Sequence, residues 1–212
     1  MSAPQNELGL VGDIGATHAR FALVKPGGPI TSARVYELND YSSLRNAIDA
    51  YLAEESPPAP PVRAVLAVAS PVTEDQITLT NHPWTFSVEA LRQQLGFRQL
   101  RIVNDFVANA AAIPHLDEND RLQIGRGVPD DNAPIGVIGP GTGLGVSALV
   151  RSPKGAMTIA SEGGHVTMSA ATAQESAILE LMRARYDHVS GERILSGPGL
   201  VNLYNALCEL AG

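Results

Sequence analysis

The sequence predicts an α/β protein. Three short apolar runs open the chain, at 8–11, 19–24 and 31–38, and each has the length and composition of a strand. Beyond them, segments with helical spacing of apolar residues alternate with further apolar runs. Alternation of this kind after a set of initial strands is typical of an α/β fold.

Helices and strands alternate through the first half of the chain. The run 62–68 is almost continuously apolar, which predicts a strand buried on both faces of a parallel sheet. Ser87 is placed to cap a helix that Gly96 ends. The elements expected here are a helix at 42–52, a strand at 62–68, a helix at 87–96, a strand at 100–103 and a helix at 104–113.

The polar stretch 116–133 separates these elements from a second group, so we expect one unit at 1–114 and another at 115–212. In the second unit, Thr172 and Glu175 form a capping box at the start of a helix. The elements expected there are strands at 135–138, 146–150 and 156–160, a helix at 172–186 and a helix at 200–210.

A weak internal repeat relates the two units. VGDIGATHARFALV, at 11–24, and IGPGTGLGVSALV, at 138–150, share one plan. Each is an apolar strand, a glycine-rich turn that holds a threonine, and a strand that ends in Ala-Leu-Val. Two units that open with such a hairpin indicate a duplicated architecture, and chance similarity between two glycine turns is the alternative.

The charge balance excludes some classes of partner. Lys and Arg total 15 and Asp and Glu total 22, so the net charge is 15 minus 22, or -7. A nucleic-acid or membrane-surface binder needs a basic face, which this composition does not favour. Phosphate ligands stay open, because backbone N–H groups and a metal ion can bind them locally.

The single cysteine and the distribution of apolar residues further limit the kind of protein that this chain can be. Cys208 is alone, so it can form neither a disulfide within the chain nor a zinc cage, and a buried place on a helix is expected for it. Residues 1–10 lack the apolar run of a signal peptide, and no stretch reaches the ~18 apolar residues of a membrane span. The expectation is a cytoplasmic protein.

The first glycine turn has the features of a phosphate loop. Its glycines let the backbone approach a phosphate, and Thr17 adds a hydroxyl donor. Asp13 would repel phosphate unless a divalent cation, usually Mg²⁺, lies between them. A plain β-hairpin turn is the alternative. The candidate phosphate-binding residues are Gly12, Asp13, Ile14, Gly15, Ala16 and Thr17.

The second glycine turn, GPGTGLG at 139–145, holds four glycines in seven residues. A plain hairpin needs one or two, so the excess favours close approach of a ligand. No Gly-Lys-Ser/Thr follows, which excludes a P-loop, and Leu144 stands where the third glycine of a dinucleotide loop would fall. The candidate phosphate-binding residues are Gly139, Gly141, Thr142 and Gly143.

Asn104 and Asp105 stand where an apolar strand meets the start of a helix. That edge is the usual place for function in open α/β sheets. Asp105 is the candidate base, because a helix N-terminus favours the ionised carboxylate that can accept a proton. Simple capping of the helix is the alternative.

Further polar residues suit a sugar. Carboxylates accept hydrogen bonds from paired hydroxyls, and an amide or imidazole adds donors. A metal site is the weaker alternative, since the chain has no His-Glu-x-x-His and no cysteine pair, and a structural role is the alternative for His165 alone. The candidate sugar-binding residues are Asn104, Asp105, Glu162, His165 and Glu192.

Seven motifs run in order along nearly the whole chain. They are GDIGAT at Gly12, SPVT at Ser70, TNHPW at 80–84, NDF at Asn104, GPGTGLG at Gly139, EGGH at Glu162 and ERILSGPGLVNLY at Glu192. Each alone is weak, but in combination they are highly specific. Together they resemble the bacterial glucokinase family.

The resemblance implies the two-lobed actin-like, or ribonuclease H-like, ATPase fold, with ATP and glucose between the lobes. Residues 1–114 would be the small N-terminal lobe and 115–212 the first part of the larger C-terminal lobe. The implied reaction transfers the γ-phosphoryl group of ATP to the 6-hydroxyl of glucose, giving glucose 6-phosphate and ADP. A homodimer is the family expectation, and no nucleic-acid or membrane partner is implied.

The resemblance also implies residue roles. Asp105 resembles the catalytic base, and Asn104, Glu162, His165 and Glu192 resemble the sugar-binding set. The glycine turns resemble the two phosphate loops, with Asp13 near Mg²⁺. Asn81 resembles part of a loop that lines the sugar cleft.

The sequence departs from the family pattern in two ways. Ala16 stands where the family commonly has glycine, and the chain stops before the part that should hold much of the adenosine pocket. Two alternatives to an active kinase therefore stay open. One is a truncated or inactive fragment that binds sugar, and the other is an actin-like nucleotide-binding module without sugar chemistry.

Overall fold

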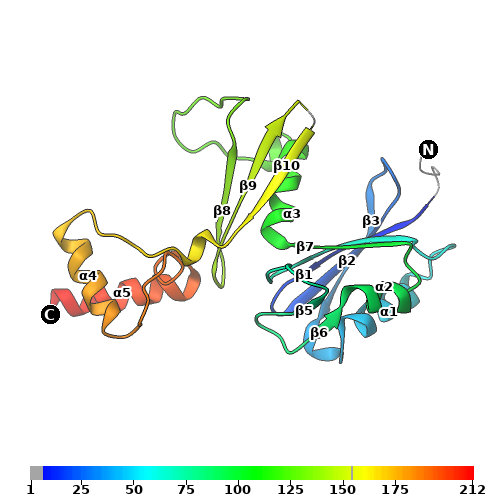
Figure 1. The fold of residues 1–212 in the computed structure, drawn as a ribbon, viewed down its shortest axis with the longest axis horizontal. Helices are drawn as coiled ribbons and strands as arrows, with labels where there is room; N and C mark the ends of the chain where they lie inside the picture. The colour runs from blue at the N-terminus through cyan, green and yellow to red at the C-terminus, as the bar shows by residue number, and fades with distance from the viewer. Residues whose placement is uncertain (1–6, 154) are drawn as a thin grey trace. The chain divides into compact units, whose positions relative to one another are not determined.

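The computed structural model describes residues 7–153 and 155–212, and the chain divides into two units, at 1–108 and 109–212 (Figure 1). Each unit has its own sheet and its own helices. The division falls six residues before the boundary expected from the sequence, inside the helix α3 (Asp105–Ala112). The assignment of the units to the lobes of a kinase remains a prediction.

A mixed five-stranded sheet, in the order β3-β2-β1-β4-β7, forms the first unit. The first three strands of the chain pair antiparallel, whereas β1, β4 and β7 pair parallel to one another. Ile14, Val68 and Asn104 lie side by side in register, so these three strands end at one edge. The strands are β1 (Gly9–Ile14), β2 (His18–Val24), β3 (Ile30–Glu37), β4 (Arg63–Val68) and β7 (Gln99–Asn104).

Two capped helices lie on one face of this sheet (Figure 1): α1 (Leu44–Glu55) and α2 (Val88–Gln94). The predicted cap at Ser87 is confirmed, since its side chain accepts a hydrogen bond from the Ala90 backbone N–H at 3.0 Å. Ser43 caps α1 in the same way. The helices bury their apolar residues against the sheet, where Phe21, Tyr51 and Leu66 are fully enclosed.

The prediction that both faces of β4 are buried is wrong. Leu66 is 0% exposed, but the adjacent Val65 is 45% exposed. Successive side chains of a strand point to opposite faces, and α1 and α2 cover only one of them. The hairpin of β5 (Gln76–Thr78) and β6 (Thr85–Ser87) was not expected, because each strand has only three residues.

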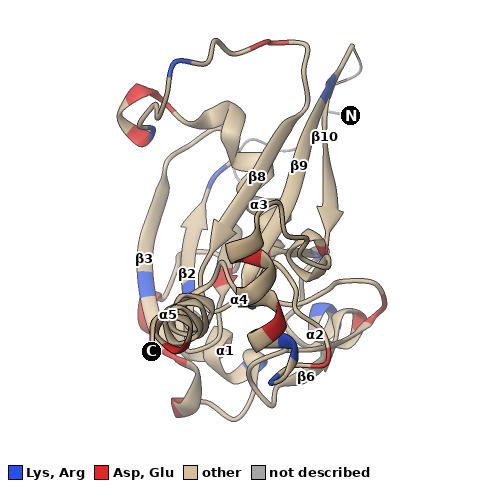
Figure 2. Cartoon of the chain, turned by 90° about the vertical axis from the view of Figure 1, so that its left-hand side faces the viewer, with Lys and Arg blue, Asp and Glu red and all other residues tan. Residues whose placement is uncertain are grey.

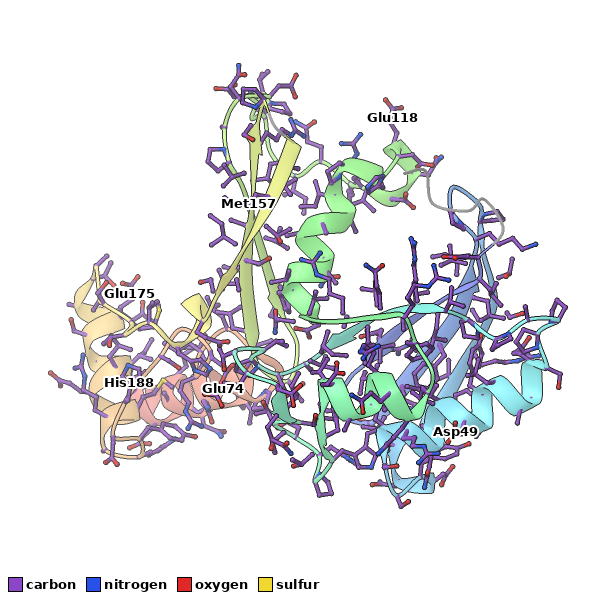
Figure 3. The ribbon with its side chains drawn as sticks, turned by 45° about the vertical axis from the view of Figure 1, so that its right-hand side comes forward. Asp49, Glu74, Glu118, Met157, Glu175 and His188 are labelled. Carbon is purple, nitrogen blue, oxygen red and sulfur yellow. The ribbon has the colours of Figure 1, made fainter. Side chains whose placement is uncertain are left out.

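The second unit joins a three-stranded antiparallel sheet, in the order β10-β9-β8, to two helices. The predicted capping box is confirmed, with Thr172 accepting from the backbone of Glu175, which is labelled at the start of α4 in Figure 3. The elements are β8 (Ile135–Pro140), β9 (Leu144–Ser152), β10 (Gly155–Ser161), α4 (Ala173–Arg183) and α5 (Gly197–Ala211).

The core of this unit is small. Ile178, Leu179 and Met182 of α4 pack with Ala206 of α5. Cys208 is exposed, so its predicted burial is wrong: it lies on a side of α5 that no described element covers. Met157, labelled on β10 in Figure 3, is 62% exposed. The described helices of both units include none that is long and apolar enough to cross a membrane.

Short 3-10 turns join several of these elements. They lie at Leu38–Asp40, Ile113–His115, Glu118–Asp120 and Gly163–His165. The stretch 116–133 is almost entirely exposed, as expected of a connection.

The one-sided burial of β4 predicts unequal effects of two neighbouring substitutions. Leu66→Ala should lower the free energy of unfolding by about 2–5 kcal/mol, because it opens a cavity in a closed core. Val65→Ala should lower the free energy of unfolding much less, because Val65 is 45% exposed. Urea unfolding of both variants measures the difference, and equal losses would contradict this description of the sheet.

Candidate functional site

The parallel strand ends gather the predicted residues of the first unit. Asp13 lies on β1 next to the glycine turn, and Asp105 begins α3 directly after β7. Asp13 pairs across the hairpin with Arg20 of β2, whose Nη1 donates to Asp13 Oδ2 at 3.0 Å. Arg20 was not singled out from the sequence, since only the strand register brings it beside Asp13.

The glycines of the first turn have different surroundings. A Cβ at Gly12 would lie 2.8 Å from Leu66 Cδ2 and 3.0 Å from Phe21 Cδ1, so a side chain there would have to displace the packed side chains of Leu66 and Phe21. A Cβ at Gly15 would meet only the His18 carbonyl oxygen, at 3.6 Å. Close approach of a ligand is therefore not needed to explain Gly12, whereas the turn at Gly15 leaves room for one.

Asn104 caps α3, as the capping alternative expected. Its Oδ1 accepts hydrogen bonds from the backbone N–H groups of Phe106 and Val107, at 3.0 and 3.3 Å. Its Nδ2 donates to the Ser70 carbonyl oxygen at 3.3 Å. The amide of Asn104 is thus held from two sides.

The Asp105 carboxyl is partly buried at the same edge. Burial raises the pKa of Asp105, and the nearby charge of Asp13 raises it further, while the Phe106 N–H that donates to Asp105 Oδ1 lowers it. The helix N-terminus acts as expected, since the Phe106 N–H favours the ionised form, but burial outweighs that hydrogen bond and the pKa is raised overall.

The second unit brings together the other predicted residues. Glu192 Oε2 accepts a hydrogen bond from the Leu144 backbone N–H at 2.9 Å, at the end of the second glycine turn. Glu192 Oε1 lies 4.0 Å from His165 Nδ1, and His165 Nε2 lies 3.7 Å from Glu162 Oε2. Three polar side chains predicted to contact a sugar thus form one cluster beside the turn.

The position of Glu192 in this cluster also explains one of the four glycines of the second turn, Gly143. At Gly143, a Cβ would occupy the position of the Glu192 carboxylate. At Gly164, within EGGH, it would collide with the Leu144 backbone carbonyl. These glycines make room for the protein itself, so the count of glycines alone overstated the case for a ligand. Thr142 and Gly141 lie in the turn, and Gly139 lies in β8.

An open cavity of about 440 Å³ adjoins the cluster. His165 and Glu192 line it together with polar residues of the segment after α4, which includes the labelled His188 of Figure 3. Its wall is braced by the Arg193 guanidinium over the Tyr186 ring, 4.5 Å from the ring centroid. Among the residues predicted from the sequence, only His165 and Glu192 lie here.

Metal binding would depend on few protein ligands. In residues 7–153 and 155–212, no three His, Cys, Asp or Glu side chains gather as a metal site would require. Acidic and basic residues are interspersed along the ribbon rather than segregated (Figure 2). Asp13 and Asp105 both lie at the edge where β1 and β7 end, and one or two carboxylates are the donors that Mg²⁺ takes alongside phosphate oxygens.

Comparison with known proteins decides the family. Residues 10–212 match the family model described as Glucokinase. The chain belongs to the glucokinase family. The glucokinase of Paramagnetospirillum magneticum is 50% identical over 98% of this chain, and that of Aromatoleum aromaticum is 48% identical over 96%. The chain spans 65% and 62% of the lengths of these two glucokinases.

A solved glucokinase has the same fold. The crystal structure of a glucokinase from an Antarctic psychrotroph is 41% identical, with a TM-score of 0.85 over 98% of this chain and 66% of that one. The resemblance inferred from the seven motifs and the actin-like α/β fold class are thereby confirmed.

The raised pKa of Asp105 predicts a stability change with a definite pH dependence. A carboxyl whose folded pKa is raised stabilises the fold when protonated, and that contribution is lost as the pH rises through the folded pKa. Asp105→Asn should therefore have a higher melting temperature than the unchanged chain at pH 7. The difference should disappear below about pH 4, near the pKa of an unfolded aspartate. A lower melting temperature at pH 7 would contradict the burial argument.

The Gly143 environment predicts a local effect. Gly143→Ala should displace the Glu192 carboxylate and speed hydrogen exchange at the Leu144 amide, which would lose its acceptor. Gly136→Ala is the matched control, because a Cβ at Gly136 meets no atom within 4 Å. NMR exchange rates compare the two, and unchanged exchange in Gly143→Ala would remove this role of the glycine.

Proposed function

We propose that this chain acts as an ATP-dependent glucokinase, which transfers the γ-phosphoryl group of ATP to the 6-hydroxyl of glucose. The products are glucose 6-phosphate and ADP. Membership of the glucokinase family and 50% identity to a glucokinase support the assignment. The observation that carries it is the partly buried Asp105 carboxyl, which follows β7 at the sheet edge where β1 and its glycine turn also end.

Asp105 is the proposed general base. Phosphoryl transfer passes through a loose transition state, so positioning and charge neutralisation dominate catalysis. The sugar hydroxyl loses its proton late in such a step, and Asp105 needs only to orient the hydroxyl and accept that proton. The bond from the γ-phosphorus to ADP breaks as the bond to the sugar oxygen forms.

Two groups of residues are proposed to bind the hexose. The first group is Asn104, Asp105 and Asn81, and the second is Glu162, His165 and Glu192. The carboxylates would accept hydrogen bonds from sugar hydroxyls, and the amides and imidazole would supply both donors and acceptors. Contacts with several hydroxyls would fix the reacting oxygen in place.

The nucleotide phosphates are proposed to contact the two glycine turns. Backbone N–H groups of these turns would bind the phosphates, and Thr17 and Thr142 would add hydroxyls. The N–H groups of Gly15 and Gly141 already donate within the turns, to the carbonyl oxygens of His18 and Gly143 at 2.9 and 2.8 Å. Asp13 would hold Mg²⁺, and its carboxylate would then exchange the ion pair with Arg20 for the metal ion. When bound, Mg²⁺ neutralises charge on the phosphates.

Coupled measurement of ADP release tests the proposal. A glucokinase releases ADP at a rate that rises with glucose concentration, whereas an actin-like nucleotide-binding module does not respond to glucose. Calorimetric titration with glucose identifies the third alternative, a chain that binds the sugar without turning over ATP. ADP release that is independent of glucose would exclude the kinase assignment.

The proposed base predicts a large kinetic effect. Asp105→Ala should lower kcat by at least ~10²-fold, the usual scale for loss of a general base. Asp49→Ala is the control: Asp49, labelled in Figure 3, lies on α1 and pairs with Arg45 at 3.3 Å. Steady-state kinetics with saturating glucose and ATP compare the two variants. An unchanged kcat in Asp105→Ala would end the assignment.

A further inference from the structure

Ser70, of the SPVT motif, is a buried polar residue for which the proposed reaction gives no role. It lies two residues after the end of β4, the middle one of the three parallel strands, and is 2% exposed. A buried hydroxyl is costly unless it is hydrogen-bonded. Its partners therefore indicate what the residue does.

The Ser70 hydroxyl makes three hydrogen bonds. It donates to the Ala69 carbonyl oxygen at 2.8 Å and accepts from the Thr80 backbone N–H at 2.8 Å. Thr80 Oγ1 lies 3.2 Å away. Because the single hydroxyl proton of Ser70 goes to Ala69, the Thr80 hydroxyl is the donor in this third contact. The hydroxyl thus holds the start of the turn between β5 and β6.

The backbone around Ser70 reaches the other two strand ends. The Ala69 N–H donates to the Ile14 carbonyl oxygen at 3.1 Å, at the start of the first glycine turn. The Ser70 carbonyl oxygen accepts from Asn104 Nδ2 at 3.3 Å. One dipeptide, Ala69-Ser70, therefore links the first glycine turn, the Asn104-Asp105 pair and the Thr80-Asn81 turn.

These contacts fix the orientation of the Asn104 amide. Its Oδ1 accepts from the first N–H groups of α3, and one N–H of Nδ2 goes to Ser70. An amide nitrogen carries two N–H groups, so the second is the one that can meet a ligand hydroxyl. Movement of the Ser70 carbonyl would release the amide and change the direction of that donor.

We propose that Ser70 is a positioning residue for the hexose. It touches no substrate atom; its hydroxyl holds the Thr80-Asn81 turn, and its carbonyl orients Asn104 toward the sugar. This inference rests on the proposed function, because it assumes that Asn104 and Asn81 bind glucose. It adds Ser70 to the residues on which sugar affinity depends.

Calorimetric titration of the whole chain with glucose tests the proposal. Ser70→Ala removes the acceptor of the Thr80 N–H and should weaken glucose binding by roughly 3- to 10-fold, the effect of one net hydrogen bond. The NMR signal of the Asn104 side-chain amide should shift in the same variant. That signal reports the orientation of the amide directly and does not depend on catalysis.

Thr78→Val is the matched control. Thr78 lies in the same hairpin, where its hydroxyl contacts only the Thr85 hydroxyl among the described residues, at 3.0 Å, on the exposed side. This variant should bind glucose as the unchanged chain does. Should Ser70→Ala fail to fold, Thr80→Val removes one contact of the same network from its exposed end and should weaken glucose binding in the same direction.

The outcomes separate this inference from the function on which it rests. If the unchanged chain binds glucose and Ser70→Ala binds it equally well, Ser70 has only a structural role and the inference is overturned. A lower melting temperature with unchanged affinity leads to the same conclusion. If the unchanged chain does not bind glucose, the proposed function fails, and the inference fails with it.

Discussion

The register of three parallel strands is the constraint on which the first unit depends. Ile14, Val68 and Asn104 end β1, β4 and β7 side by side, so the segments that follow them emerge at one edge. Backbone hydrogen bonds set this register, and a slip of one residue would turn every side chain of a strand to the other face. The glycine turn, Ser70 and Asp105 therefore lie together although they are far apart in the sequence.

The same edge shows a conflict between stability and chemistry. The Asp105 carboxyl, which is the proposed base, is held where burial and the charge of Asp13 disfavour its ionised form. Such pairs of carboxylates are common at active sites and are relieved by a cation or a partner. In this structure Arg20 pairs with Asp13, which is consistent with a site whose negative charge requires compensation.

In the second unit, space around the backbone determines the site. Glu192 can accept a hydrogen bond from the Leu144 N–H because Gly143 has no side chain. The EGGH turn can approach the Leu144 carbonyl because Gly164 has no side chain either. Two glycine-rich motifs, separated in the sequence, thus fit against one another and against one carboxylate. The glycines of both motifs are explained partly by this packing and partly by the proposed phosphate contacts.

The sequence by itself determined what depends on neighbouring residues. The cap at Ser87 and the Thr172–Glu175 capping box could be predicted, because a cap and the N–H groups it satisfies lie within three residues. So could the family, which rests on the order of seven motifs. Only the tertiary structure decided that β4 is exposed at Val65, that Cys208 is on the surface, that Arg20 pairs with Asp13 and that Ser70 joins three strand ends. Each of these depends on which distant segment packs against the residue, and no local pattern carries that information.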